Sequence, residues 1–232
     1  MTDILILYDN HADTGLQPGW GFSAAVRTAG KVLLFDCGAD RLVLSDNAKA
    51  LGIAVRDIPA VALSHDHCDH TGGLSAVLHD RMSLYVPRAF ARRFSFPRER
   101  AIIVHRVGRP IEIAPGIHSL GQLGRDIPEQ ALLIETGAGP ALVTGCAHPG
   151  IVRLVQRAAR LAGRPPELLI GGFHLLHQEP DAVRATIAHL LRLGIHRVAP
   201  CHCTGERAIP LFREAFGDRF ISVQAGTRLE LD

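Results

Sequence analysis

The stretch that decides the fold runs from Val61 to Leu74 and reads VALSHDHCDHTGGL. Four potential metal ligands lie within six of its positions: His65, His67, Asp69 and His70. The apolar run at 60–63 before them has the length of a buried strand, and the segment from Leu74 reads as a helix. We therefore expect the ligands in the loop at the carboxyl end of a strand, where α/β folds place their chemistry.

The spacing of these side chains suits metal binding. His65 and His67, two positions apart in an extended segment, point the same way and can share one ion. Asp69 and His70 come after the turn and can face a second ion. Metal ions such as zinc bind imidazole nitrogen and carboxylate oxygen, and catalytic sites leave one position open for water. The alternative is a polar, histidine-rich turn that binds no metal.

Length and composition predict one sizeable domain over 1–232, since no linker-like tract divides the chain. Hydrophobic residues make up 47% of the sequence, and the formal net charge of +2 is too small to indicate nucleic acid or a membrane surface as a partner. The N-terminal segment does not resemble a secretory signal, and no apolar stretch approaches the roughly 20 residues that span a bilayer. The odd number of cysteines fits reduced thiols in the cytoplasm better than a disulfide framework.

The predicted elements alternate in a way that favours two mixed β-sheets. Strands dominate the first part of the chain, and strand–loop–helix units follow twice. Two mixed sheets packed face to face, each covered outside by helices, satisfy this order, so the predicted fold class is α/β, a four-layer αβ/βα sandwich. Two local predictions belong to this interpretation: a short helix that starts at Pro87 and a strand over 220–223.

Histidines follow four separate predicted strands. A single histidine at a strand end is more often structural than a ligand. Four such ends are harder to dismiss, because parallel βα units bring these loops to one edge of a sheet. The four loops carry the motif at 65–70, Cys146 with His148, His174, and His202.

The sequence resembles the metallo-β-lactamase superfamily. Residues 65–70 fit its H-x-H-x-D-H signature, and further segments come in the order of one branch, namely DN at 9–10, FDCG at 35–38, TGCAHPGI at 144–151, GGFHL at 171–175 and PCHCTG at 200–205. That branch contains metal-dependent hydrolases and proteins similar to dihydropterin–ribofuranosylaminobenzene-phosphate synthase. The likeness covers most of the chain and is weakest over 90–120.

The resemblance implies a set of metal ligands and a cofactor of two zinc ions, with iron, manganese or nickel as alternatives. One ion would use His65, His67 and His148, and the other Asp69, His70 and His202. Relatives usually carry a bridging aspartate where this chain has Cys146. Either the Cys146 thiolate bridges, which favours zinc, or Cys146 packs beneath the site. A further histidine of the superfamily has no counterpart, because His118 lies in a peripheral segment, so a single metal ion is the alternative.

Other residues have two interpretations each. His174, after two glycines, is either a general acid or phosphate contact or a structural residue. Asp36 is either the acceptor that orients a ligand imidazole or a turn residue. Asp9 and Asn10 are candidates to line the cleft. The remaining cysteines near the motifs lack C-x₂-C spacing and are interpreted as packing residues: Cys68, Cys201 and Cys203.

Arginines and phenylalanines gather between 88 and 100. Arginine suits phosphate recognition and phenylalanine suits ring stacking, so the segment is a candidate contact for an anionic or aromatic substrate portion. The alternative is a solvated amphipathic helix. The residues concerned are Arg88, Arg92, Arg93, Arg98, Arg100, Phe90, Phe94 and Phe96.

The favoured function is hydrolysis of a small-molecule ester or phosphoester by a metal-activated hydroxide. Asp69 would ligate metal and orient the nucleophile, and His174 would protonate the leaving group. The alternatives are a pterin-related synthase, implied by the branch, and a non-hydrolytic metal or redox protein. His67 argues against the latter, since a di-iron relative carries a carboxylate there. The expected partner is the substrate, anionic or phosphate-bearing, and a homodimer is compatible with such folds.

Overall fold

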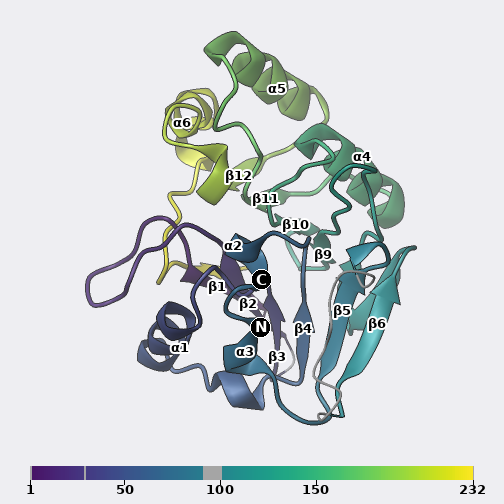
Figure 1. Cartoon of the computed structure of the whole chain (residues 1–232). Helices are drawn as coiled ribbons and strands as arrows, with labels where there is room; N and C mark the ends of the chain where they lie inside the picture. The colour runs from purple at the N-terminus through teal and green to yellow at the C-terminus, as the bar shows by residue number, and fades with distance from the viewer. Residues whose placement is uncertain (1, 29, 91–100, 232) are drawn as a thin grey trace. The chain divides into compact units, whose positions relative to one another are not determined.

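A computed structural model describes residues 2–28, 30–90 and 101–231 of the chain (Figure 1). The chain forms two compact units. Unit 1 comprises Met1–Gly108 and Gln224–Asp232, and unit 2 comprises Arg109–Val223. Because unit 2 interrupts the sequence of unit 1, the two are described in turn.

Unit 1 is built on a mixed sheet with the strand order β13-β1-β2-β3-β4-β5-β6 among the described residues. The pairs from β13 to β3 are antiparallel and those from β3 to β6 are parallel. The strands are β1 (Asp3–Tyr8), β2 (Ser23–Thr28), β3 (Lys31–Phe35), β4 (Ala60–Ala62), β5 (Ser83–Pro87), β6 (Ile103–Val107) and β13 (Arg228–Glu230). Three α-helices accompany them: α1 (Arg41–Ala50), α2 (Cys68–Thr71) and α3 (Leu74–Val77), with a 3₁₀ turn at Val55–Asp57.

The core of unit 1 lies between this sheet and the helices α1 and α3. Strand β1 reads DILILY and is buried along its whole length, as a strand covered on both faces is. Leu44 and Ala48, one helical turn apart on α1, belong to the same apolar cluster as Leu34 and Leu84 of the sheet. Burial of these apolar faces is what fixes α1 on the sheet.

Helix α1 begins with a side-chain cap. Asp40 Oδ1 accepts hydrogen bonds from the backbone N–H groups of Leu42 at 2.6 Å and Val43 at 3.2 Å. An Asp40→Ala variant leaves both donors to water, and we expect it to lose about 1 kcal/mol in the free energy of unfolding. Urea denaturation checks this value. Asp40→Ser keeps a capping oxygen and is expected to stay within a few tenths of a kcal/mol of the wild type, and equal losses in both variants would contradict the capping role.

Unit 2 has a second mixed sheet, with the order β12-β11-β10-β9-β8-β7 among the described residues. Strands β10, β11 and β12 run parallel, and the pairs from β10 to β7 are antiparallel. The strands are β7 (Ile111–Ala114), β8 (Ile117–Ser119), β9 (Leu132–Ile134), β10 (Ala141–Thr144), β11 (Leu168–Gly171) and β12 (Arg197–Pro200). The helices are α4 (Ile151–Ala162), α5 (Pro180–Arg192) and α6 (Ile209–Phe216), with 3₁₀ turns at His202–Thr204 and Gly217–Arg219.

The parallel part of this sheet is covered by its helices (Figure 1). On α4, Ile151, Leu154, Val155 and Ala158 recur at helical spacing, and all four are buried. They share one apolar cluster with residues of the sheet such as Leu169. This packing holds the strand ends that carry the candidate ligands of unit 2.

The predicted fold class is confirmed in its two mixed sheets flanked by helices. Two local predictions are wrong. Pro87 does not start a helix, because it is the last residue of β5, a position that proline tolerates although it has no N–H to donate. Most of the segment for which that helix is predicted lies outside the described residues. Segment 220–223 forms no strand and makes one isolated bridge, from Phe220 to Val198, while the Phe220 side chain packs against the core cluster of unit 2.

Two further points concern the number of domains and the presence of membrane-spanning helices. The single domain over 1–232 stays a prediction, since the structure describes two compact units. In the described part of the chain, no helix combines the length and the apolar character that crossing a membrane requires.

Candidate metal centre

In unit 1 the candidate residues are positioned by the parallel strands β3 and β4. Phe35, the last residue of β3, pairs with Ala62, the last residue of β4. The loops after the two strands therefore start side by side, and the Asp36 N–H donates to the carbonyl oxygen of Ala62 at 2.9 Å. This register puts the Asp36 carboxylate next to Ser64, the residue before the histidine motif.

Asp36 is the acceptor of a buried hydrogen-bond network. Its Oδ1 accepts from the Ser64 N–H at 2.6 Å, and its Oδ2 accepts from the Ser64 hydroxyl at 2.6 Å and lies 2.7 Å from His70 Nδ1. Ser64 Oγ also lies 2.8 Å from His65 Nδ1. All four residues are fully buried. The predicted contact between Asp36 and a ligand imidazole is present.

This network decides which ring nitrogens carry protons. A carboxylate only accepts, so His70 Nδ1 must donate to Asp36. The single hydroxyl proton of Ser64 goes to Asp36, so His65 Nδ1 must donate to Ser64 Oγ. In the neutral form of each ring the lone pair then lies on Nε2, and this nitrogen can bind a metal ion.

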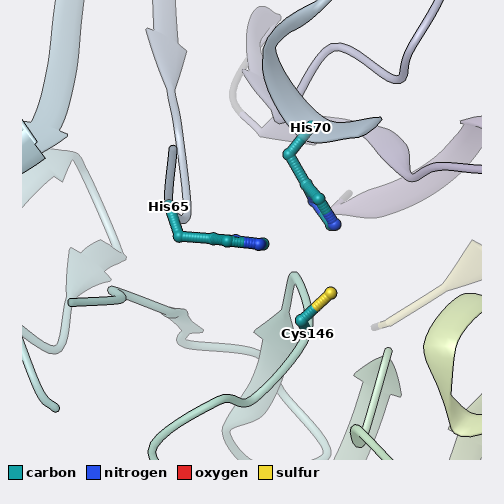
Figure 2. Close-up of side chains that lie close together, drawn as sticks. All are labelled: His65, His70 and Cys146. Atoms are coloured by element: carbon teal, nitrogen blue, oxygen red, sulfur yellow. The ribbon is translucent and has the colours of Figure 1, made fainter. Parts of the chain in front are cut away.

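The remaining ligands of the motif lie around these two rings. The ring centroids of His65 and His70 are 4.2 Å apart, and those of His65 and His67 are 4.6 Å apart. Figure 2 shows His65 on the loop after β4 and His70 on α2. His70 Nε2 lies 3.8 Å from Asp69 Oδ2. The structure therefore brings all four predicted ligands of unit 1 together.

In unit 2 the candidates follow the parallel strands β10, β11 and β12. Thr144, Gly171 and Pro200 are in register at their carboxyl ends. The three loops are tied by backbone hydrogen bonds, from Gly172 to Gly145 at 3.1 Å and from Cys201 to Gly171 at 3.0 Å. The strand-end residues predicted from the sequence are therefore neighbours within this unit.

A buried carboxylate organises the loop after β10. Glu129 accepts three backbone N–H donors: Oε1 from Cys146 at 3.0 Å and Ala147 at 2.8 Å, and Oε2 from His148 at 2.7 Å. Three successive donors on one carboxylate fix the direction in which Cys146 and His148 project. Cys146 is labelled in Figure 2. Glu129 was missed in the sequence, because a single acidic residue in segment 128–131 carries no positional signal.

The donor atoms of unit 2 form two overlapping groups, in each of which all atoms lie within 4.8 Å of one another. One contains Cys146, His148 and His174, and the ring centroids of its two histidines are 4.2 Å apart. The other contains Cys146, His202 and Cys203, all buried. The sequence interpretation treated Cys203 as a packing residue and did not place it in a donor group.

Two of these residues have shifted pKa values. The hydrogen bond with Cys203 raises the pKa of His174, and burial opposes this shift in part. Burial raises the pKa of the Cys203 thiol, but hydrogen bonds with Cys146 and His174 and the nearby His202 outweigh burial and bring it well below its usual value. Interaction between the two side chains explains both directions.

The loops of both units hold non-glycine residues in the left-handed region. Four of them are in the candidate site, Asp36 at φ 59°, Ala147 at 60°, His174 at 55° and His202 at 48°. Such conformations cost about 1–3 kcal/mol each and persist only where surrounding contacts impose them. For Asp36 and Ala147 these contacts are the hydrogen bonds of the Asp36 and Glu129 carboxylates described above.

The structure also places other residues that were singled out in the sequence. Asp9 is buried and accepts the N–H of His11 at 3.2 Å, so it shapes its own loop. Phe90 is 2% exposed and lies in the core of unit 1, which excludes it from stacking on a substrate. Arg88 is exposed. The rest of the predicted Arg/Phe contact, Arg92, Arg93, Phe94, Phe96, Arg98 and Arg100, lies outside the described residues.

Comparison with known proteins supports the resemblance. The chain is 29% identical to a 7,8-dihydropterin-6-methyl-4-(β-D-ribofuranosyl)-aminobenzene-5′-phosphate synthase of Methanocaldococcus jannaschii, over 90% of this chain and 88% of the relative. It is 25% identical to an uncharacterized protein of the same organism, over 89% of this chain and 92% of the relative.

Among solved structures, the fold is similar to that of Tm1679, a metal-dependent hydrolase of the β-lactamase superfamily. The TM-score is 0.84 and the identity 29%, over 100% of this chain and 99% of the other. The sequence profile of the metallo-β-lactamase superfamily matches residues 18–202, which include the donors named above except Cys203. The chain belongs to the metallo-β-lactamase superfamily.

Proposed function

We propose that the chain is a metal-dependent hydrolase that acts on a small-molecule ester or phosphoester. The observation that carries the proposal is the Asp36–Ser64 network, which orients the rings of two buried histidines through their Nδ1 atoms, as the partners of metal-binding histidines do. The similarity to a metal-dependent hydrolase at a TM-score of 0.84 supports it.

In this proposal the donors of the two units act together, as the family match across both suggests. One zinc ion is assigned to His65, His67 and His148, and the other to Asp69, His70 and His202, with Cys146 as a further ligand. Bound there, a divalent ion supplies a water of lowered pKa and a positive charge for the developing oxyanion. Asp69 orients the nucleophile, and His174 holds the proton for the leaving group.

The proposed acid role of His174 can be tested with a variant that is expected to keep its metal ions, so that a loss of turnover is not caused by a loss of metal. We expect His174→Ala to keep its metal content and to lower turnover about 10²-fold, because a positioned general acid contributes at least that much. Metal analysis and turnover are measured on the same preparations. His177→Ala, an exposed histidine three residues further on, is the matched control and is expected to keep full turnover. A fully active His174→Ala enzyme would refute the acid role.

The function itself is tested with a panel of aryl esters and aryl phosphoesters. Turnover is expected to disappear after chelation and to return with zinc, and heavy-oxygen water is expected to leave its label in the product. Hydrolysis that survives complete metal removal contradicts the proposal.

A second candidate function is a pterin-related synthase, which the 29% identity to a protein of that name favours. Incubation with a dihydropterin that carries a leaving group on its 6-methyl carbon and with a ribofuranosylaminobenzene phosphate would then give a coupled product and the released leaving group, with no label from water in the coupled product. Coupling in the absence of ester hydrolysis would replace the first proposal by the second.

A further inference from the structure

We propose that Cys203 is a metal ligand, and that Cys146, His202 and Cys203 of unit 2 form a thiolate-rich site for a soft divalent ion such as zinc or cadmium. The inference deepens the proposed function and rests on it only in requiring that the chain binds a metal ion. It depends on unit 2 alone.

The first support is that two sulfurs and one imidazole meet in a buried place. Cys146 follows β10, and His202 and Cys203 follow β12, so the donors come from loops 57 residues apart in sequence. Their ligand atoms lie within 4.8 Å of one another, and the residues are 3%, 2% and 5% exposed, respectively. Thiolate and imidazole together are the usual ligands of protein-bound zinc.

The second support is the backbone that permits this approach. Strand β11 lies between β10 and β12 and ends at Gly171, and Gly172 follows it directly. A Cβ atom on Gly172 would lie 2.5 Å from Cys203 Sγ and 3.3 Å from the Cys146 Cα. Any side chain there would push the two cysteines apart. The Gly-Gly segment thus leaves the space through which the sulfurs approach each other.

Distances favour an ion over a disulfide between these sulfurs. With Zn–S bonds of about 2.3 Å, two sulfurs on a tetrahedral ion lie roughly 3.8 Å apart. From a separation of at most 4.8 Å the sulfurs need to close by about 1 Å at most. A disulfide needs about 2.05 Å between them, a much larger movement in a packed interior. All five cysteines are thiols in the structure.

The site is tested with cobalt(II) added to metal-free protein, because each sulfur–cobalt bond adds to a charge-transfer band in the near ultraviolet. We expect the wild type to show this band, Cys203→Ser to lose about half of it, and the Cys146→Ser/Cys203→Ser double variant to lose all of it. Cys201→Ser is the matched control. Cys201 is buried beside the same loop and belongs to no donor group, so this variant is expected to keep the full band.

Dependence on the ion assigned to His65, His67 and His148 is tested with His67→Ala. The band is expected to remain, because His67 belongs to a different donor group from Cys146, His202 and Cys203. A full band in Cys203→Ser overturns the proposal, and so does its disappearance in His67→Ala. Cadmium NMR on the wild type with one equivalent of the ion needs no variant. A shift typical of two thiolate ligands supports the site, and a shift typical of one or none overturns it.

None of these measurements depends on turnover. The proposed thiolate site and the proposed hydrolase function can therefore be refuted independently of each other. A band with two sulfurs in a protein that hydrolyses nothing keeps this site and removes the proposed function. Hydrolysis together with an unchanged band in Cys203→Ser keeps the function and removes the site.

Discussion

An Asp36→Ala variant is expected to be the most damaging single substitution in unit 1. It removes the acceptor of the Ser64 N–H, the Ser64 hydroxyl and His70 Nδ1 in a fully buried place. Each buried donor left without its acceptor costs about 1–3 kcal/mol, and the hydroxyl can turn elsewhere, so we expect a loss of roughly 3–5 kcal/mol. That is a large part of the total stability of about 5–15 kcal/mol of a typical protein. Urea denaturation measures it.

The same variant is expected to bind metal about 10–100-fold more weakly, because His65 and His70 are no longer held in one tautomer. Asp36→Asn separates the two effects. Asparagine tolerates the left-handed conformation of this position, with φ 59°, and keeps the shape of the side chain. Its amide N–H₂, however, faces an N–H donor, which forces a change in the His70 ring or in Ser64.

For Asp36→Asn we therefore expect the smaller stability loss and a reduced metal affinity, measured by competition with a chromophoric chelator. Asp46→Ala, at an exposed position of α1, is the control and should change neither quantity. Wild-type affinity in Asp36→Asn would show that the network does not orient the ligands.

A Glu129→Ala variant is expected to have the corresponding effect in unit 2. It leaves the N–H groups of Cys146, Ala147 and His148 without their acceptor. Hydrogen bonds to a charged group contribute about 1.5–3 kcal/mol each, so a loss of about 4 kcal/mol or more follows. The left-handed Ala147 depends on these bonds, and the loop is expected to change its path without them.

The Glu129→Gln variant is expected to lose only part of these hydrogen bonds. One amide oxygen can replace Oε1 and keep the bonds to Cys146 and Ala147, while the amide nitrogen meets the N–H of His148. We expect a loss of roughly 1–3 kcal/mol and faster hydrogen exchange at His148 than at Cys146. Glu135→Ala, whose side chain is 68% exposed, should stay within about 0.5 kcal/mol of the wild type. Equal exchange at all three amides in Glu129→Gln would contradict the assignment of oxygens.

Much of the fold follows from local sequence patterns. Strand β1 and helix α4 are recognised by an apolar run and by helical spacing of apolar residues, both of which report directly on burial. The motif at 65–70 follows a strand, and Asp36 follows its parallel neighbour, so their meeting could be predicted. Pro87 was misjudged because a proline fits both a helix start and a strand end, and only the neighbouring strand decides.

The parts that could not be predicted depend on contacts between distant residues. Nothing in the sequence shows that Glu129 reaches the loop of Cys146, 17 residues later. The pairing of Cys146 with Cys203 is likewise invisible, because their proximity arises from the register of β10, β11 and β12 and from the two glycines between them. The role of Ser64 could not be predicted for a different reason. Its hydroxyl lies between Asp36 and the His65 ring, and only the positions of these three groups show that it links them.

The interrupted sequence of unit 1 has a consequence for synthesis on the ribosome. Strand β1 pairs with β2 on one side and with β13 on the other, and β13 is translated only after the whole of unit 2. Until then the nascent chain presents a long apolar strand with an unpaired edge, which is the kind of surface that chaperones bind and that aggregates form on. Unit 2, by contrast, emerges as one uninterrupted segment. A ribosome that stalls before β13 therefore leaves the early half of the protein exposed while the later half has all of its own strands.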